Sequence, residues 1–213
     1  MDNYSNERKG KKSRIILSVI IVAVIILAVA GITLSYDFEN KNFDLGRIYK
    51  LFYESEKEVL YKGNHIVLYN YPEYDLAKDE SSRQNMINRG LGYEALQYYA
   101  QENGITVTET EIKNQISKAK EAYDSVQDKK AKEDFAEILA GMDITEEEYW
   151  KSDMLYNSTR RILIFDKVMT NQRSQIQESN PNFTSSEIDA ELEKWKNETI
   201  ERVLEEDHVK KVE

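Results

Sequence analysis

The chain has 213 residues, of which 40% are hydrophobic and 32% charged, and its formal net charge at pH 7 is −10. A surface this acidic repels phosphate backbones, which argues against nucleic acid as a partner. The sequence has no cysteine, so disulfides, a thiolate nucleophile and a lipid-modified cysteine are excluded, and its 8 glycines and 2 prolines argue against an all-β fold.

Residues 15–34 form an uninterrupted apolar segment, IILSVIIVAVIILAVAGITL, without a single charge. A helix of this length spans about 30 Å, the thickness of the hydrocarbon core of a bilayer. Residues 1–14 hold five basic and two acidic side chains, and positive charge stays on the cytoplasmic side of a membrane. The sequence therefore predicts a cytoplasmic tail over 1–14, a transmembrane helix over 15–34 that contacts the lipid bilayer, and an extracytoplasmic remainder at the cell membrane.

A cleavable secretory signal is the alternative interpretation of the same segment. Residues 28–30, Ala-Val-Ala, fit the small-x-small pattern of a cleavage site, and Ile15–Leu27 would be the apolar region before it. The chain would then be secreted after cleavage near Ala30. Because apolar residues continue through Ile32 and Leu34, the pattern favours an uncleaved anchor. Both interpretations place the remainder outside the cytoplasm.

Beyond the apolar segment we expect a linker over 35–46 and one mainly helical domain over 47–213. From Pro72 onward, apolar residues recur at helical spacing up to an Asn-Gly pair at 103–104, with two internal glycines that weaken the helix. Pro72 suits a first helical turn, and the Asn-Gly pair tolerates the left-handed backbone that ends helices. The pattern thus predicts a helical stretch that ends at the pair, either continuous or bent or broken at the two glycines.

A small β-element is predicted at the two ends of this domain. Residues 58–61 and 66–69 are β-prone and flank Gly63-Asn64, which is typical of a β-hairpin. Residues 208–212 alternate and predict a short strand. The simplest completion is that this strand pairs with the hairpin, which returns the end of the chain to its beginning.

Three helix starts repeat the pattern apolar-Thr-x-x-Glu-apolar. In such a capping box the Thr hydroxyl accepts a hydrogen bond from the third helical amide, and the Glu side chain reaches back to the Thr amide. The three threonines are Thr108, Thr145 and Thr184. We expect the helix after Thr145 to run unbroken to about Gln177, and a further helix over about 129–140 to stop at Gly141.

No enzyme motif is present in the sequence. It lacks a glycine-rich phosphate loop, a zinc-protease helix motif and a GxSxG elbow. The two histidines, His65 and His208, make no metal site without further ligands, and we interpret both as ordinary strand-end residues. The sequence therefore predicts a protein that is not an enzyme, with no catalytic residue, metal or cofactor.

Aromatic residues are the notable surplus, with 14 tyrosines in the chain. Two adjacent pairs lie on predicted helices, where neighbours point about 100° apart, so one of each pair can lie off the buried stripe. One interpretation is that both members pack between long helices. The other is an amphipathic surface that grips extended, apolar segments of other proteins. The candidate polypeptide-binding residues are Tyr98, Tyr99, Tyr149, Trp150 and Tyr156.

Several segments resemble one family of exported chaperones. The stretches are ALQYYAQENGITVTETEI over 95–112, EDFAEILAGMDITEEEYWKSDMLYNSTRRILIFDKV over 133–168, and the hairpin EVLYKGNHIVLY. They resemble the core of SurA-like and PrsA-like proteins, in which a helix ends in Gly-Ile-Thr-Val and a later long helix opens with Thr-Glu-Glu-Glu-Tyr. The closing helix with Trp195 and the tail DHVKKVE resemble that family's C-terminal helix and returning strand.

The resemblance implies a chaperone that binds unfolded exported polypeptides through an apolar, aromatic-preferring surface. Many members carry a parvulin-type prolyl isomerase domain between the long helix and the final one. Here only residues 170–181 separate those helices, so the chain resembles the chaperone core alone, without isomerase activity. PrsA-like members are typically lipoproteins, a role the predicted anchor would replace. The alternative is a non-enzymatic interaction or regulatory module for one dedicated membrane or envelope partner.

Overall fold

The structure is a computed structural model that describes residues 41–212. Among these residues the chain forms eight helices and three short strands. It divides into two compact units. Unit 1 holds the described residues up to Ser55 together with Thr110–Tyr156, and unit 2 holds Glu56–Glu109 together with the residues from Asn157 onward. Each unit has its own buried clusters. The single domain that the sequence predicts over 47–213 stays a prediction.

Unit 1 is entirely helical. Its elements are α2 (Lys41–Glu54), α5 (Glu109–Asp124), α6 (Lys129–Met142), α7 (Glu146–Lys151) and the first turn of α8 (Asp153–Ser179). The first turns of α2 occupy residues 41–46, which the sequence predicts to be part of a linker. The core of the unit is an aromatic cluster, in which Tyr123 and Phe135 pack with rings 5.1 Å apart.

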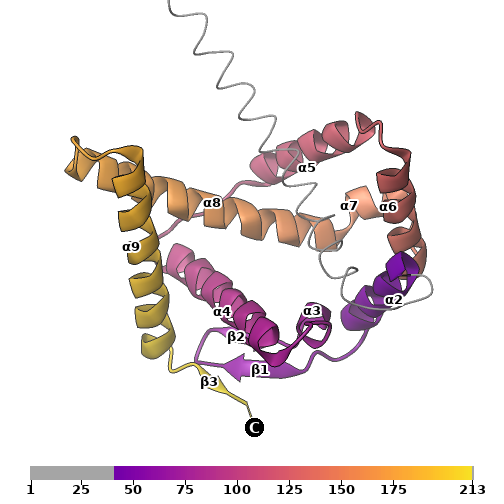
Figure 1. The fold of residues 1–213 in the computed structure, drawn as a ribbon, viewed down its shortest axis with the longest axis horizontal. Coiled ribbons are helices and arrows are strands. Elements are labelled where there is room, and N and C mark those ends of the chain that lie inside the picture. The colour runs from indigo at the N-terminus through magenta and orange to yellow at the C-terminus, as the bar shows by residue number, and fades with distance from the viewer. Residues whose placement is uncertain (1–40, 213) are drawn as a thin grey trace, which may run out of the picture. The chain divides into compact units, whose positions relative to one another are not determined.

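Helices α2 and α6 lie side by side and touch backbone to backbone (Figure 1). A Cβ at Gly46 would lie 2.1 Å from the carbonyl oxygen of Ile138, and one at Gly141 would lie 2.0 Å from that of Phe43. The predicted stop at Gly141 is therefore wrong: α6 continues through it to Met142. The helix ends instead at Asp143, whose φ of 60° is left-handed.

The predicted unbroken helix from 146 to Gln177 is also wrong, because Ser152 divides it into α7 and α8. Ser152 has φ −71° and ψ 146°, an extended conformation. Its hydroxyl donates to the carbonyl of Tyr149 at 2.8 Å and accepts from the amide of Leu155 at 3.2 Å. The same side chain thus closes one helix and caps the next, as serine does at helix N-termini.

Two of the three predicted capping boxes are confirmed. At Thr145 and Thr184 the hydroxyl accepts from the amide of the glutamate three residues on, and that glutamate accepts from the threonine amide. The hydrogen bond from the Thr145 amide to the Glu148 carboxylate measures 2.7 Å, and the one from the Thr184 amide to the Glu187 carboxylate is equally long. The box at Thr108 stays a prediction, although α5 does begin at the next residue.

Unit 2 combines helices with the small sheet. Its elements are β1 (Val59–Lys62), β2 (Val67–Tyr69), α3 (Pro72–Asp75), α4 (Glu80–Glu102), the rest of α8, α9 (Ser185–Glu206) and β3 (Lys210–Lys211). The sheet order is β2-β1-β3, with both pairings antiparallel. The predicted hairpin and the predicted pairing of the returning strand are both observed, and β3 lies beside β1 in Figure 1.

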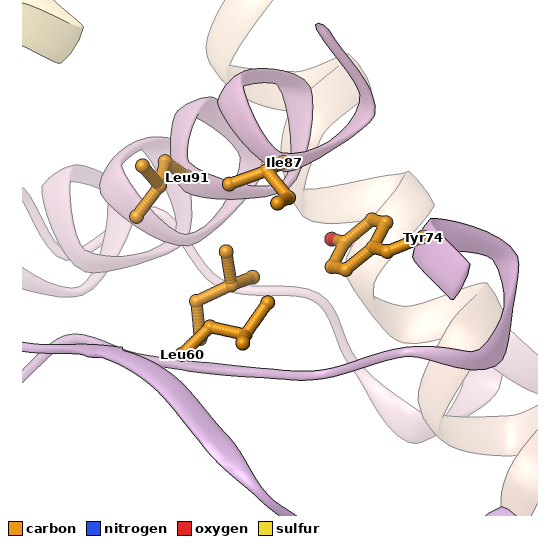
Figure 2. Packing of buried hydrophobic residues seen from close by; sticks show 5 residues of the cluster. Leu60, Tyr74, Ile87 and Leu91 are labelled. Carbon is orange, nitrogen blue, oxygen red and sulfur yellow. The ribbon is translucent and has the colours of Figure 1, made fainter. Parts of the chain in front are cut away.

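The core of unit 2 lies between the sheet and helices α3 and α4. Figure 2 shows Leu60 from β1 pointing toward Tyr74 of α3 and toward Ile87 and Leu91 of α4. The helical stretch predicted from Pro72 is interrupted between α3 and α4, at residues 76–79 and not at the glycines. Helix α4 runs unbroken through both glycines. Gly90 has a packing role, because a Cβ there would lie 2.2 Å from the Tyr74 hydroxyl.

A second set of buried residues joins α4, α8 and α9 within unit 2. Leu96 and Ala100 of α4 pack on Ile164 and Val168 of α8, and Trp195 of α9 closes the cluster. Only the five residues between Ser179 and Ser185 connect α8 to α9. These three helices provide the walls of the candidate site.

The structure corrects the prediction of a fold with a membrane-spanning helix. No helix within residues 41–212 is both long and apolar enough to cross a bilayer. The longest, α8, has 27 residues but carries charged side chains along its length. The predicted span over 15–34 and the alternative cleavage near Ala30 lie outside the described residues. The described residues therefore form a mainly helical fold with a three-stranded antiparallel sheet, and this finding contradicts the predicted single-pass membrane location.

Candidate functional site

Two of the five candidate aromatics belong to the core region of unit 1. Tyr149 is only 6% exposed and packs edge-on against Phe135 at 5.1 Å. Burial raises the pKa of the Tyr149 hydroxyl to about 12. Trp150 is half-buried against the same cluster, with its indole Nε1 donating to Glu146 at 3.3 Å and Lys120 above its ring. Packing in the core of unit 1 therefore explains why aromatic residues stand at both positions.

Tyr156 is half-buried in the first turn of α8. It belongs to unit 1, as do Tyr149 and Trp150, whereas Tyr98 and Tyr99 belong to unit 2. The five candidates are thus divided between the two units.

Tyr98 and Tyr99 lie near the end of α4, where α9 packs against it. The Tyr98 ring stacks on His65 with centroids 5.0 Å apart and planes 12° apart. The Tyr99 ring meets Trp195 of α9 edge-on at 5.6 Å. Both tyrosines are half-buried, so each presents part of its ring to solvent while the rest packs.

The two tyrosines line a pair of neighbouring pockets, which we call together the tyrosine groove. The acidic pocket has a volume of about 240 Å³ and the amide pocket about 220 Å³. The acidic pocket is lined by His65, Tyr98, Tyr99, Glu102, Asn103, Arg202, Val203, Glu206 and Asp207. The amide pocket is lined by Tyr99, Asn103, Ile105, Val168, Asn171, Gln172 and Gln175. The pockets share Tyr99 and Asn103, so they adjoin.

The amide pocket pairs an apolar wall with a row of carboxamides. Tyr99, Ile105 and Val168 supply the apolar wall. Asn171, Gln172 and Gln175 come from one stretch of α8, and within the described residues none of their side chains makes a hydrogen bond. A carboxamide both donates and accepts, as a peptide group does. The pocket therefore places the half-buried Tyr99 and Ile105 next to carboxamides that are free to pair with a backbone.

The floor of the acidic pocket is built around the carboxylate of Asp207, whose side chain is 0% exposed. Its oxygens accept from the backbone amides of His65 at 2.9 Å and Ile66 at 2.8 Å, and one lies 2.8 Å from the His65 ring Nδ1. Burial by itself would raise the pKa of Asp207, but these hydrogen bonds outweigh it and lower the pKa below its ordinary value. The buried group is thus a permanent anion at neutral pH.

The pocket above that floor has a negative potential. Burial raises the pKa of the Tyr98 hydroxyl above its ordinary value, and three nearby carboxylates raise it further. They are Glu102, Asp207 and Glu206. The guanidinium of Arg202 pairs with Glu206 at 3.0 Å and offsets one of these charges. Two negative charges remain, so the pocket favours a cation over an anion.

No protein family, curated protein or solved structure matches this chain with significant similarity.

Of the residues that line the groove, sequence reasoning named only Tyr98 and Tyr99 as candidates. The carboxamides of α8 lie in the segment TNQRSQIQ, and a cluster of Asn and Gln on one helix was the available signal. Asp207 and Glu102 gave no local signal, because their roles depend on elements far away in sequence. Among residues 41–212 no group of three or more His, Asp or Glu side chains is placed to hold a metal ion.

Proposed function

We propose that this chain is a non-enzymatic, chaperone-like protein that binds extended segments of unfolded polypeptides in the tyrosine groove, without prolyl isomerase activity. The observation that carries the proposal is the placement of the Tyr99 ring beside the free carboxamides of α8. An extended chain presents donors and acceptors that α-helices and sheets otherwise satisfy internally. Carboxamides can pair with such a backbone whatever its side chains are, which suits the binding of many different unfolded proteins.

The size of the pockets supports a polypeptide rather than a cofactor as the ligand. Each pocket has less volume than the roughly 300–1,000 Å³ typical of sites for drug-sized ligands. A single side chain fits such a space, and the two adjoining pockets would take two side chains of one extended segment. Aromatic walls such as Tyr98 and Tyr99 suit this task, because they offer a large rigid contact area that also tolerates water.

The family resemblance in the sequence supports the same proposal. The connection between α8 and α9 is even shorter than the sequence predicts, since only five residues separate these helices. An inserted isomerase domain has no place there. Binding without catalysis is therefore the proposed activity.

The proposal is tested by mixing the full chain, without ATP, with several chemically denatured proteins and following their aggregation by light scattering. We expect aggregation to be suppressed for more than one client. A double substitution, Asn171→Ala with Gln175→Ala, should weaken the suppression several-fold and leave the melting temperature unchanged, because both side chains are exposed and unbonded. Moderate salt should have little effect, since salt screens surface charges rather than apolar contact.

The matched control is Tyr93→Ala. Tyr93 is an exposed tyrosine on the same helix, α4, and lines neither pocket. This variant should retain full suppression, which separates the groove from the general effect of removing a surface aromatic. If the wild-type chain suppresses the aggregation of none of several clients, the chaperone proposal falls. A module for one dedicated partner would then be the better explanation.

A further inference from the structure

We propose that the acidic pocket selects a lysine or arginine side chain of the polypeptide held in the groove. This inference rests on the proposed function and adds to it a preference for segments in which a basic residue lies next to apolar ones. The bound cation would sit between the end of α4 and the end of α9, above the buried carboxylate of Asp207.

The first argument comes from the helix ends. Helix α4 ends at Glu102 and α9 ends at Glu206, and both residues line the acidic pocket. The C-terminus of a helix carries a partial negative charge that favours cations. Neither α4 nor α9 has a basic residue in its last turn. The negative charges of Glu102 and Glu206 therefore lie next to helix ends that are themselves partly negative. A cation bound between them would reduce this repulsion.

The second argument concerns which carboxylate is available. Asp207 uses its oxygens on the amides of His65 and Ile66, so it contributes charge but little contact. Glu206 pairs with Arg202. Glu102 has neither a hydrogen bond nor an ion pair among the described residues, so it is the carboxylate we assign to the incoming cation.

The third argument concerns the rest of the side chain. Lysine and arginine carry long apolar stems, which pack along apolar surfaces while the charged end stays in polar surroundings. In the acidic pocket, the rings of Tyr98 and Tyr99 supply that surface. A tyrosine ring also attracts a cation placed over its face. His65 stacks on one face of Tyr98, so that face is not available to the cation.

The experiment uses the full chain and a set of labelled, extended peptides of about ten residues that contain tyrosine and leucine. The peptides are identical except at one central position, which is Lys, Arg, Gln or Glu. Affinity is measured by fluorescence anisotropy. Occupation of the groove is followed separately through Trp195, which touches Tyr99, in a Trp150→Phe background. That background leaves Trp195 as the only tryptophan of the chain.

We expect the Lys and Arg peptides to bind roughly fivefold tighter than the Gln peptide, and the Glu peptide to bind weakest. The preference should fade at about 0.5 M salt, where charges more than a few ångströms apart are screened. Glu102→Gln should bring the Lys-to-Gln ratio close to one. The control Glu205→Gln changes net charge equally on the last turn of α9 but lies outside the pocket, and it should keep the ratio.

Three outcomes would overturn the inference. If the peptides bind and change the Trp195 emission but Lys and Gln are equal, the cation preference is wrong while the proposed function stands. If the ratio is lost in Glu205→Gln and kept in Glu102→Gln, the preference reflects overall charge and not the pocket. If no peptide binds, the proposed function fails and this inference fails with it.

Discussion

Asp207 holds His65 from 142 positions away in the sequence, by accepting its backbone amide at 2.9 Å and contacting its ring Nδ1 at 2.8 Å. The other oxygen accepts the amide of Ile66, and the backbone oxygen of Asp207 accepts the amide of Asn64. A Cβ at Gly63 would lie 2.1 Å from the carboxylate, so the hairpin turn closes directly on it. One buried side chain thus joins the turn between β1 and β2 to the end of α9.

We predict that Asp207→Ala destabilises unit 2 selectively. The substitution leaves the buried amide of Ile66 without a partner, and a hydrogen bond to a charged acceptor contributes about 1.5–3 kcal/mol. Unfolding in urea, followed by Trp195 fluorescence in a Trp150→Phe background, should show a loss of at least that size. His65→Ala is the control: its ring is 60% exposed, so we expect a loss below about 1 kcal/mol. Equal losses in the two variants would contradict the role given to Asp207.

The same carboxylate should make stability depend on pH in the acid range. The pKa of Asp207 is lower in the folded protein than its ordinary value, so its ionised form stabilises the fold. That contribution is complete above the unfolded pKa of about 3.9, and it is lost as the pH falls through the folded pKa. The difference in unfolding free energy between wild type and Asp207→Asn should therefore be largest above pH 5 and shrink below pH 4. A difference that grows as the pH falls would contradict the assignment.

A third prediction concerns the contact between α2 and α6. Gly141→Ala should destabilise unit 1 by about 1–3 kcal/mol, because the new methyl group meets the backbone oxygen of Phe43, which cannot move independently. Trp150 fluorescence in a Trp195→Phe background reports this unit. The control is Gly92→Ala in α4 of unit 2, followed by Trp195 fluorescence in a Trp150→Phe background. There the nearest atom is the flexible Ile200 methyl at 3.1 Å. Alanine favours helix over glycine by about 1 kcal/mol, so the control should be neutral or stabilising.

The features that could be predicted from the sequence are those with a short sequence separation. The capping boxes at Thr145 and Thr184 are complete within four residues, and the hairpin needs only two β-prone runs and a Gly-Asn pair. The break at Ser152 was equally local, but helical periodicity continued across it. A serine followed by an acidic residue is an N-cap signal, and it outweighed the periodicity.

The remaining features depend on partners that no local pattern reveals. In the sequence, Gly141 has the pattern of a helix stop, but in the structure it lets α2 pack closely on α6. Asp207 has the pattern of a surface carboxylate, but in the structure it is buried under the hairpin turn. Adjacent aromatics pose the same difficulty. The spacing showed that one residue of each pair can leave the buried stripe, but the position of the neighbouring helix decides how far each is buried. In unit 1 that neighbour is Phe135, which buries Tyr149.

A fourth prediction is that the chain does not accelerate prolyl isomerisation. With five residues between α8 and α9, no isomerase domain is inserted at the position where the resembling family carries one. In a standard assay with a proline-containing peptide, the full chain should leave cis-to-trans isomerisation uncatalysed, so that it takes tens to hundreds of seconds at 25 °C. Acceleration that a single substitution abolishes would contradict this prediction.

The last prediction separates binding residues from core residues among the candidate aromatics. Tyr149→Ala should lower the stability of unit 1 by about 3–5 kcal/mol, since the ring is buried against Phe135. Tyr98→Ala should cost much less, because the ring is half-buried and one face meets only the exposed His65. Client aggregation measured at a temperature where both variants remain folded then tests function. Suppression should fall in Tyr98→Ala and persist in Tyr149→Ala. The reverse result would move the binding surface from the groove of unit 2 to unit 1.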